Sequence, residues 1–256
     1  MHYKFGSLLL YRNIALIMLS CLTFSAISCE LTIRYERFGA VKSVDEHAEL
    51  HGLDVDFAKT LLAQTECSYR FVELPWARAL GGLKAGRIDL MLSVSKTTER
   101  EKYYYFLGPQ RKETIVLAMN KANIYPISRL EDLIYLPAPV AVHRGAYYGE
   151  AFEEVLKKHP DRFITVVDNK TKLDLLAHKK ISGFLEEKGN LAYQKKFNPS
   201  FSHIYIDDFV VNSMDVYYAF SKRSLSESQF QQFEQIFKTT GYQKEKRKIL
   251  AKYGLE

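Results

Sequence analysis

The segment from Leu74 to Phe106, LPWARALGGLKAGRIDLMLSVSKTTEREKYYYF, limits the possible folds more than any other part of the chain. Its first half has apolar residues at the spacing of one helix face: Trp76, Ala79, Leu80 and Leu83. Gly86 stands where such a helix would end. A short buried strand is predicted at Ile88 to Leu92, and six hydroxyl-bearing or charged residues follow from Ser95 to Arg100. This order places small hydrogen-bond donors and the cation of Arg100 at the carboxyl end of a strand, where open α/β sheets bind ligands. It therefore predicts a site that binds an anion.

The rest of the chain alternates between short apolar strands and amphipathic helices. Strands are predicted at residues 31–35, 69–74, 88–92, 113–119, 140–143, 163–167, 181–185 and 216–220. Helices are predicted at residues 52–65, 76–86, 171–178, 226–237 and 242–253, and the spacing of Tyr148, Phe152 and Leu156 marks one more. This alternation is typical of an α/β fold in which crossover helices connect parallel strands.

Several segments, in this order, resemble a known family: the periplasmic solute-binding proteins of the polar amino-acid class, family 3. In the central segment the resemblance rests on Trp76, the LKAGRIDLML run, the S-x-T-x-x-R loop and the aromatic YYYF strand. It continues in HGLDVDFAKTLL, VAVHRGAYYG, FLEEKG and VYYAFSK, and covers essentially the whole mature chain. The resemblance implies an α/β, two-lobed periplasmic-binding-protein-like fold of type II. Each lobe would be a mostly parallel sheet flanked by helices, and two strands would form the hinge.

The expected division of the chain follows from this fold and from the N-terminal segment. Residues 14–26 are nearly all apolar and follow the basic residues Lys4 and Arg12, a pattern that fits a secretory signal and is too short to span a bilayer. Residues 1–28 are therefore expected to be a signal peptide for export to the periplasm. In the family's fold, residues 29–116 and 214–256 would form lobe 1, and residues 117–213 would form lobe 2.

Three cysteines are present, and two of them, Cys29 and Cys67, lie outside the expected signal. Each comes just before a predicted strand, and in the fold expected here these two strands are parallel neighbours. An oxidising compartment would favour a disulfide between them, which would stabilise the protein by about 2–4 kcal/mol. The alternative is a lipid anchor on Cys29, because the AISC sequence that ends there is a poor but possible lipobox.

Arg100 is the leading candidate for ligand binding. A guanidinium presents paired donors in one plane that match a carboxylate, and the hydroxyls of Ser95 and Thr97 lie close by in the sequence. In the family, the arginine at this position binds the α-carboxylate of the ligand. Ser95 and Ser93 also occupy ligand positions of the family, and glycine is frequent at the position of Ser93. Thr97 has two open interpretations, a ligand hydroxyl or the cap of the turn that carries Arg100. The competing interpretation of Arg100 is a surface residue paired with a neighbouring glutamate.

Three further candidates belong to the first lobe. Trp76 stands at the family position of an aromatic wall of the cleft, where it would cover a ligand side chain by apolar or cation–π contact; a lone tryptophan at helical spacing also suits a core. Arg78 stands where small residues are common in the family, and it would favour an acidic ligand if it faced the cleft rather than solvent. Glu36, at the end of the first strand, either reaches the cleft or is a surface acid.

The second lobe adds two candidate groups. Gly145 and Ala146 lie where a strand is predicted to turn into a helix, and backbone N–H groups at a helix start attract anions. Glu187 aligns with the family acid that pairs with the α-ammonium of the ligand, and Glu186 is expected on the other face. The family more often has aspartate at this position, so the longer side chain would reach further or bind something other than an α-amino acid.

Charge and motif content exclude several function classes. The net charge of +6 is scattered apart from a small C-terminal cluster, so no dense basic stripe marks a nucleic-acid site. The seven histidines show no metal-ligand spacing, and neither a nucleophile pattern nor a glycine-rich phosphate loop is present. No cofactor is expected, and the protein is not expected to be an enzyme.

The resulting hypothesis is a monomeric periplasmic binding protein that captures a small polar solute, an amino acid or related carboxylate, between its lobes. Lobe closure would be read by the membrane permease of an ABC transporter. A receptor that reports ligand occupancy to a sensor protein is the alternative. A dehydratase of cyclic acids, with Glu187 or Glu36 as its acid or base, is a third reading on the same fold.

Overall fold

The computed structural model describes residues 29–36 and 50–255. The expected signal peptide therefore lies outside the described residues. Within the described ranges, no helix is long and apolar enough to cross a membrane.

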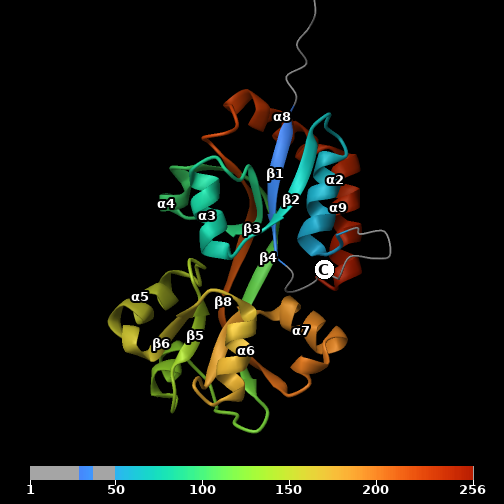
Figure 1. Ribbon diagram of the computed structural model, residues 1–256. Coiled ribbons are helices and arrows are strands. Elements are labelled where there is room, and N and C mark those ends of the chain that lie inside the picture. Colours follow the sequence, from blue (N-terminus) through green and yellow to red (C-terminus); the bar gives the residue numbers. More distant parts are fainter. Residues whose placement is uncertain (1–28, 37–49, 256) are drawn as a thin grey trace, which may run out of the picture.

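The fold is α/β, with eight strands in one sheet across the described residues, in the order β2-β1-β3-β8-β4-β7-β5-β6 (Figure 1). The strands are β1 Glu30–Tyr35, β2 Ser68–Glu73, β3 Leu90–Ser95, β4 Tyr104–Asn120, β5 Val140–His143, β6 Phe163–Val166, β7 Gly183–Glu187 and β8 Ile204–Ser221. The α-helices are α2 Leu53–Leu62, α3 Trp76–Lys84, α4 Thr98–Glu101, α5 Glu150–Lys158, α6 Asn169–Ala177, α7 Lys188–Phe197, α8 Glu227–Lys238 and α9 Thr240–Tyr253. The described residues also form the 3₁₀ helices η1 Leu130–Tyr135, η2 Pro160–Arg162 and η3 Pro199–Phe201.

Two lobes are joined by the long strands β4 and β8, which pair antiparallel with each other (Figure 1). We call lobe 1 the part built on β1, β2 and β3 with helices α2, α3, α8 and α9, and lobe 2 the part built on β5, β6 and β7 with helices α5, α6 and α7. Within lobe 1, β1 is parallel to both β2 and β3, and within lobe 2, β5 is parallel to both β6 and β7. The predicted hinge of two strands is therefore present. The exact residues at which the lobes divide stay a prediction.

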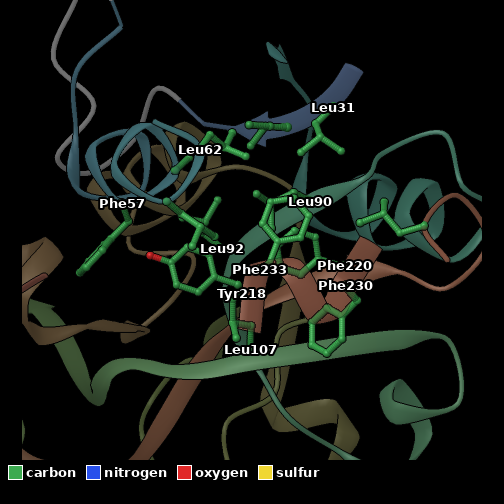
Figure 2. Packing of buried hydrophobic residues seen from close by; sticks show 14 of the residues in the cluster. Leu31, Phe57, Leu62, Leu90, Leu92, Leu107, Tyr218, Phe220, Phe230 and Phe233 are labelled. Atoms are coloured by element: carbon green, nitrogen blue, oxygen red, sulfur yellow. The ribbon is translucent and has the colours of Figure 1, made fainter. Parts of the chain in front are cut away.

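Each lobe has its own apolar core. In lobe 1, Phe57 and Leu92 pack around Tyr218 and Phe220 of β8 (Figure 2). In lobe 2, the largest cluster gathers Leu117, Phe152 and Leu185 with other side chains from β4, α5 and β7. Full burial of such a side chain contributes about 1.5–3 kcal/mol, so each lobe has a basis for its own stability.

Cys29 and Cys67 form a disulfide, with their Cα atoms 4.6 Å apart. The bond lies at the start of the β1–β2 pair, where Glu30 is in register with Ser68. The prediction of this disulfide from the sequence is confirmed, because parallel neighbours start side by side.

Two parts of the local prediction are corrected. β3 begins at Leu90 rather than Ile88. Just before it, the Asp89 carboxylate accepts a hydrogen bond from the Thr32 backbone N–H at 2.7 Å, in the place of a backbone acceptor. The helix expected directly after Gly145 begins only at Glu150. Gly145 and Gly149 have φ values of 77° and 95°, which are outside the helical region, and residues 146–149 between the turn at Gly145 and the helix have no regular secondary structure.

Candidate functional site

The candidate site is a cavity of about 210 Å³ between the two lobes. This volume is far larger than the ~10–15 Å³ that one water molecule needs by the same measure. The lining comes from the ends of β1 and β3 and the start of α2 in lobe 1, from β4 of the hinge, and from β5, α6, β7 and α7 in lobe 2. A ligand in this cavity would contact both lobes.

Arg34, Glu36 and Trp76 form the wall on the lobe 1 side. Arg34 makes an ion pair with Glu36, donates from Nε to the Leu74 carbonyl at 3.1 Å and stacks 5.1 Å from the centroid of the Trp76 ring. Burial raises the pKa of Glu36 above its ordinary value, although the charge of Arg34 opposes this shift. Of the two interpretations of Glu36, the one that places it at the cleft agrees with the structure.

Ser93 has a left-handed backbone, with φ of 56°, the conformation that favours glycine. This conformation agrees with a position at which glycine is frequent in the family. The Ser93 N–H donates to Gln110 Oε1 at 2.9 Å, and its hydroxyl donates to Asp54 Oδ1 at 2.7 Å. Ser93 and Asp54 both line the cavity, so α2 contributes a carboxylate that the sequence analysis did not single out.

Arg100 lies at the edge of the cleft and is not among the residues that line the cavity. Its Nη1 donates to the carbonyl and the hydroxyl of Ser95, at 2.7 and 2.5 Å, and its Nη2 donates to the Gly145 carbonyl at 2.8 Å. Ser95 is buried and does line the cavity. Thr97 caps α4, because its hydroxyl accepts from the Arg100 N–H at 3.3 Å, and it lies outside this cavity.

The Gly145 carbonyl of lobe 2 accepts hydrogen bonds from two residues of lobe 1. It accepts from Arg100 and also from Trp76 Nε1, at 3.2 Å, and both donors belong to lobe 1. The sequence analysis expected Gly145 and Ala146 to offer N–H groups from a helix start, and that expectation is wrong because α5 begins at Glu150. Ala146 still lines the cavity.

The hinge strand β4 adds the pair Arg111 and Glu113, which the sequence analysis missed. Together with Ile115 they alternate along β4 and line the cavity. The Arg111 side chain is only 6% exposed, and its guanidinium lies 3.6 Å from Glu113 Oε1 and 3.7 Å from Glu187 Oε1. Burial raises the pKa of Glu113 to about 7, against the attraction of Arg111. The signal that could have found this pair is the i, i+2, i+4 spacing of Arg111, Glu113 and Ile115, but the predicted strand began only at residue 113.

Glu186 and Glu187, at the end of β7, both line the cavity, so the prediction that Glu186 lies on the other face is wrong. Glu187 caps α7 by accepting from the N–H groups of Gly189 and Asn190 at 3.0 and 2.5 Å. Glu186 binds the buried Lys172 Nζ at 2.8 Å. Burial alone would raise the pKa of Glu186, but the charge and hydrogen bond of Lys172 outweigh burial and lower it.

His143 ends β5 beside this cluster and lines the cavity. Burial, and after it the charge of Lys172, lower its pKa to about 4, so the ring is neutral at pH 7. Its buried Nε2 has no hydrogen-bond partner among the described residues. Arg78, in contrast, is exposed and outside the cavity lining.

The described residues contain no group of three or more histidine, cysteine, aspartate or glutamate side chains that could hold a metal ion. Carboxylates, cations and aromatic rings dominate the lining. Such a site can bind a small polar solute by charge-assisted hydrogen bonds and ring contacts.

Comparisons with known proteins agree on one fold. The sequence model of the bacterial extracellular solute-binding proteins, family 3, matches residues 33–254. No curated protein sequence matches the chain. A putative L-cystine ABC transporter protein from Listeria monocytogenes superposes with a TM-score of 0.73 at 17% identity, over 88% of this chain and 95% of that one.

Two other solved structures are similar to the same degree. A histidine kinase sensor domain with similarity to periplasmic binding proteins has a TM-score of 0.73 at 16% identity, over 89% of this chain and 96% of that one. The ancestral amino-acid-binding protein AncCDT-1, a precursor of cyclohexadienyl dehydratase, has a TM-score of 0.71 at 19% identity, over 95% of this chain and 100% of that one. At these identities, the likeness concerns the fold.

Proposed function

Because this chain belongs to family 3 of the bacterial extracellular solute-binding proteins, we propose that it captures a small polar solute between its lobes and presents the closed form to a membrane permease. The supporting observation is the cavity itself, which residues of both lobes and of the hinge strand line together. A solute that contacts both walls is bound more tightly by the closed form than by an open one. Only this difference in affinity can drive closure.

The Gly145 carbonyl supports the closure part of the proposal. Arg100 and Trp76 reach it from lobe 1, so these two hydrogen bonds exist only while the lobes are together. In the proposal, Arg100 also positions Ser95, which faces the cavity. A ligand carboxylate would bind the Arg100 guanidinium by replacing the Gly145 carbonyl as the acceptor of its hydrogen bond.

Glu187 and Ser93 are proposed as ligand contacts, because both line the cavity with polar groups. Glu187 is already engaged as the cap of α7, so a ligand ammonium would share its carboxylate with the two N–H groups. Trp76 is proposed as an aromatic wall, with Arg34 above its ring.

A thermal-shift screen of the exported chain against the amino acids, polyamines and small di- and tricarboxylates tests the proposal. A solute at a hundred times its dissociation constant adds about 2.7 kcal/mol of stability. We expect one chemical group of solutes to raise the midpoint and small-angle scattering to show a more compact particle. A bound solute that mass spectrometry recovers chemically changed would favour an enzyme instead, and a screen without any stabilising solute would refute solute capture.

A separate experiment identifies the membrane protein that binds the closed form. Pull-down of the solute-saturated protein from solubilised membranes is expected to enrich an ABC permease. Enrichment of a sensor kinase instead would favour the receptor alternative.

A further inference from the structure

The cavity has more carboxylates than cations. Five acidic side chains line it: Glu36, Asp54, Glu113, Glu186 and Glu187. Three permanently basic ones, Arg34, Arg111 and Lys172, face them, and His143 is neutral at pH 7. Charges in a partly dry cavity interact far more strongly than charges in water. A cavity with this lining therefore favours a solute that brings positive charge.

The ion pairs show which carboxylates of the cavity lack a cation of their own. Arg34 is matched by Glu36, and Lys172 is matched by Glu186 at 2.8 Å. Arg111 lies between two carboxylates, at 3.6 Å from Glu113 and 3.7 Å from Glu187, and these distances are too long for hydrogen bonds.

Glu187 has other donors, because two backbone N–H groups of α7 bind its oxygens. Glu113 has only the ion pair with Arg111 as a contact of its carboxylate within the described part of the chain. Its side chain is 17% exposed, and it faces the cavity. Removing a carboxylate from part of its water without giving it a hydrogen-bond donor has a cost, which a ligand or a proton that supplies a donor would offset. Burial raises the pKa of Glu113 to about 7, so a proton occupies this position in part of the molecules at neutral pH.

The rest of the lining suits an organic cation as well. Six aromatic side chains contribute to it: Tyr35, Trp76, Tyr147, Tyr148, Tyr193 and Tyr253. Aromatic faces attract ammonium and guanidinium groups, and the Trp76 ring already has the guanidinium of Arg34 at 5.1 Å.

We propose that Glu113 on the hinge strand is a cation subsite and that the captured solute has a net positive charge, with an ammonium or guanidinium group held at Glu113. This inference rests on the proposed function, because it names the chemical class of solute for the same cavity. It also gives the hinge a direct contact with the ligand, since β4 connects the lobes.

Matched pairs of solutes test the charge class on the unmodified protein by isothermal titration calorimetry. Arginine and citrulline have nearly the same shape and differ by one positive charge, and putrescine and succinate have four carbons with opposite charges. We expect arginine to bind at least about tenfold more tightly than citrulline, the effect of one charge-assisted hydrogen bond. We expect putrescine to bind more tightly than succinate.

The variant Glu113→Gln tests the subsite, because it keeps the shape of the side chain and removes its charge. We expect it to reduce arginine affinity at least about tenfold and to leave citrulline affinity nearly unchanged. The control is Glu131→Gln, an exposed position in η1 outside the cavity, where no change is expected. If Glu113→Gln still prefers arginine over citrulline as the unmodified protein does, Glu113 is not the subsite.

Binding should also depend on pH. The charged groups around Glu113 are Arg111 on the same strand, Arg100 on α4, Asp54 on α2, and Glu186 and Glu187 on β7. A group with pKa of about 7 is about one-tenth ionised at pH 6 and about nine-tenths at pH 8, so arginine should bind about tenfold more weakly at pH 6. In Glu113→Gln this dependence should vanish.

The outcomes separate this inference from the proposed function. If glutamate or succinate binds and closes the lobes while arginine, lysine and putrescine do not, the cation subsite is refuted and solute capture stands. Equal affinities for arginine and citrulline would refute the net positive charge in the same way. If no solute binds at millimolar concentration, both the subsite and solute capture are refuted.

Discussion

Arg100 and Gly145 are 45 positions apart in the chain and on different lobes, yet Nη2 of Arg100 donates to the Gly145 carbonyl at 2.8 Å. The same guanidinium holds Ser95 through its carbonyl and hydroxyl. One arginine therefore connects a cavity residue of lobe 1 to a turn of lobe 2. In the proposed function, this position would link the strength of solute binding to the closed arrangement of the lobes.

Arg100→Ala should reduce solute affinity by more than about tenfold, because it removes hydrogen bonds of a charged donor to both lobes. Titration calorimetry with the solute found in the screen measures this. The control is Arg87→Ala, an exposed arginine of the same lobe. Affinity equal to that of the unmodified protein in Arg100→Ala would remove Arg100 from the binding mechanism.

Gly145→Ala should weaken closure. The φ of 77° costs about 1–2 kcal/mol for a residue with a Cβ atom, and the new Cβ would lie 3.3 Å from the Ala77 Cβ of lobe 1. We expect weaker solute binding and a larger radius of gyration at saturating solute. Gly81→Ala is the matched control, because no atom lies within 4 Å of its added Cβ; an identical response of the two variants would contradict the prediction.

Cys67→Ser should lower the free energy of unfolding by about 2–5 kcal/mol, because the Cys29–Cys67 bond restricts the unfolded chain. Urea titration followed by circular dichroism measures the loss. A reductant should destabilise the unmodified protein by a similar amount and leave Cys67→Ser unchanged. A reductant effect of equal size on both proteins would mean that it does not act through this bond.

Tyr218→Phe should destabilise lobe 1 by about 1–3 kcal/mol. The hydroxyls of Tyr218 and Tyr242 lie 2.6 Å apart with both side chains buried, so the variant leaves the Tyr242 hydroxyl without this partner. The double variant with Tyr242→Phe should lose less stability than the sum of the two single ones. Tyr69→Phe, at an exposed position, is the control, and strictly additive losses would contradict coupling between the hydroxyls.

Stability should depend on pH through Glu113. Its pKa rises from 4.5 to about 7 on folding, mainly by burial, so the folded protein binds a proton more tightly than the unfolded chain. Its contribution to the free energy of unfolding is therefore present below pH 4.5 and is lost as the pH rises to about 7, by an amount on the order of 3 kcal/mol.

His143 acts in the opposite direction between about pH 4 and 6.5, because its pKa is lowered. The stability difference between the unmodified protein and Glu113→Gln isolates the Glu113 contribution. Urea unfolding at pH 5, 6, 7 and 8 should show that the unmodified protein loses stability relative to the variant as the pH rises. A difference that is constant with pH would show that Glu113 ionises normally.

Sequence reasoning predicted the parts of the fold that depend on local pattern. β5 and α9 lie close to their predicted positions, because an apolar run or a helical period is set by neighbouring residues. β4 and β8 are much longer than predicted. Their polar middle sections are strand because they pair with each other across the hinge, with shifts in register after Leu107, and such pairing is not visible in the local pattern.

The same division holds in the candidate site. Ser93, Ser95 and Glu187 were predicted from motifs, and they line the cavity. Arg111, Glu113 and Lys172 were missed, because an isolated charged residue in a sequence suits a solvated surface as well as a cleft. Lys172 is buried, and its Nζ donates hydrogen bonds to Glu186 and to the Leu185 carbonyl, partners that the sequence does not show to be near it.

The sequence by itself determined the α/β class, the family and the disulfide partners, because each depends on residue types in a fixed order along the chain. The tertiary structure alone decided which charges share the cavity and which donors meet the Gly145 carbonyl. The reason is physical, since an electrostatic interaction depends on the distance between two groups and on their removal from water. Both quantities are set when β4 and β8 bring the lobes together.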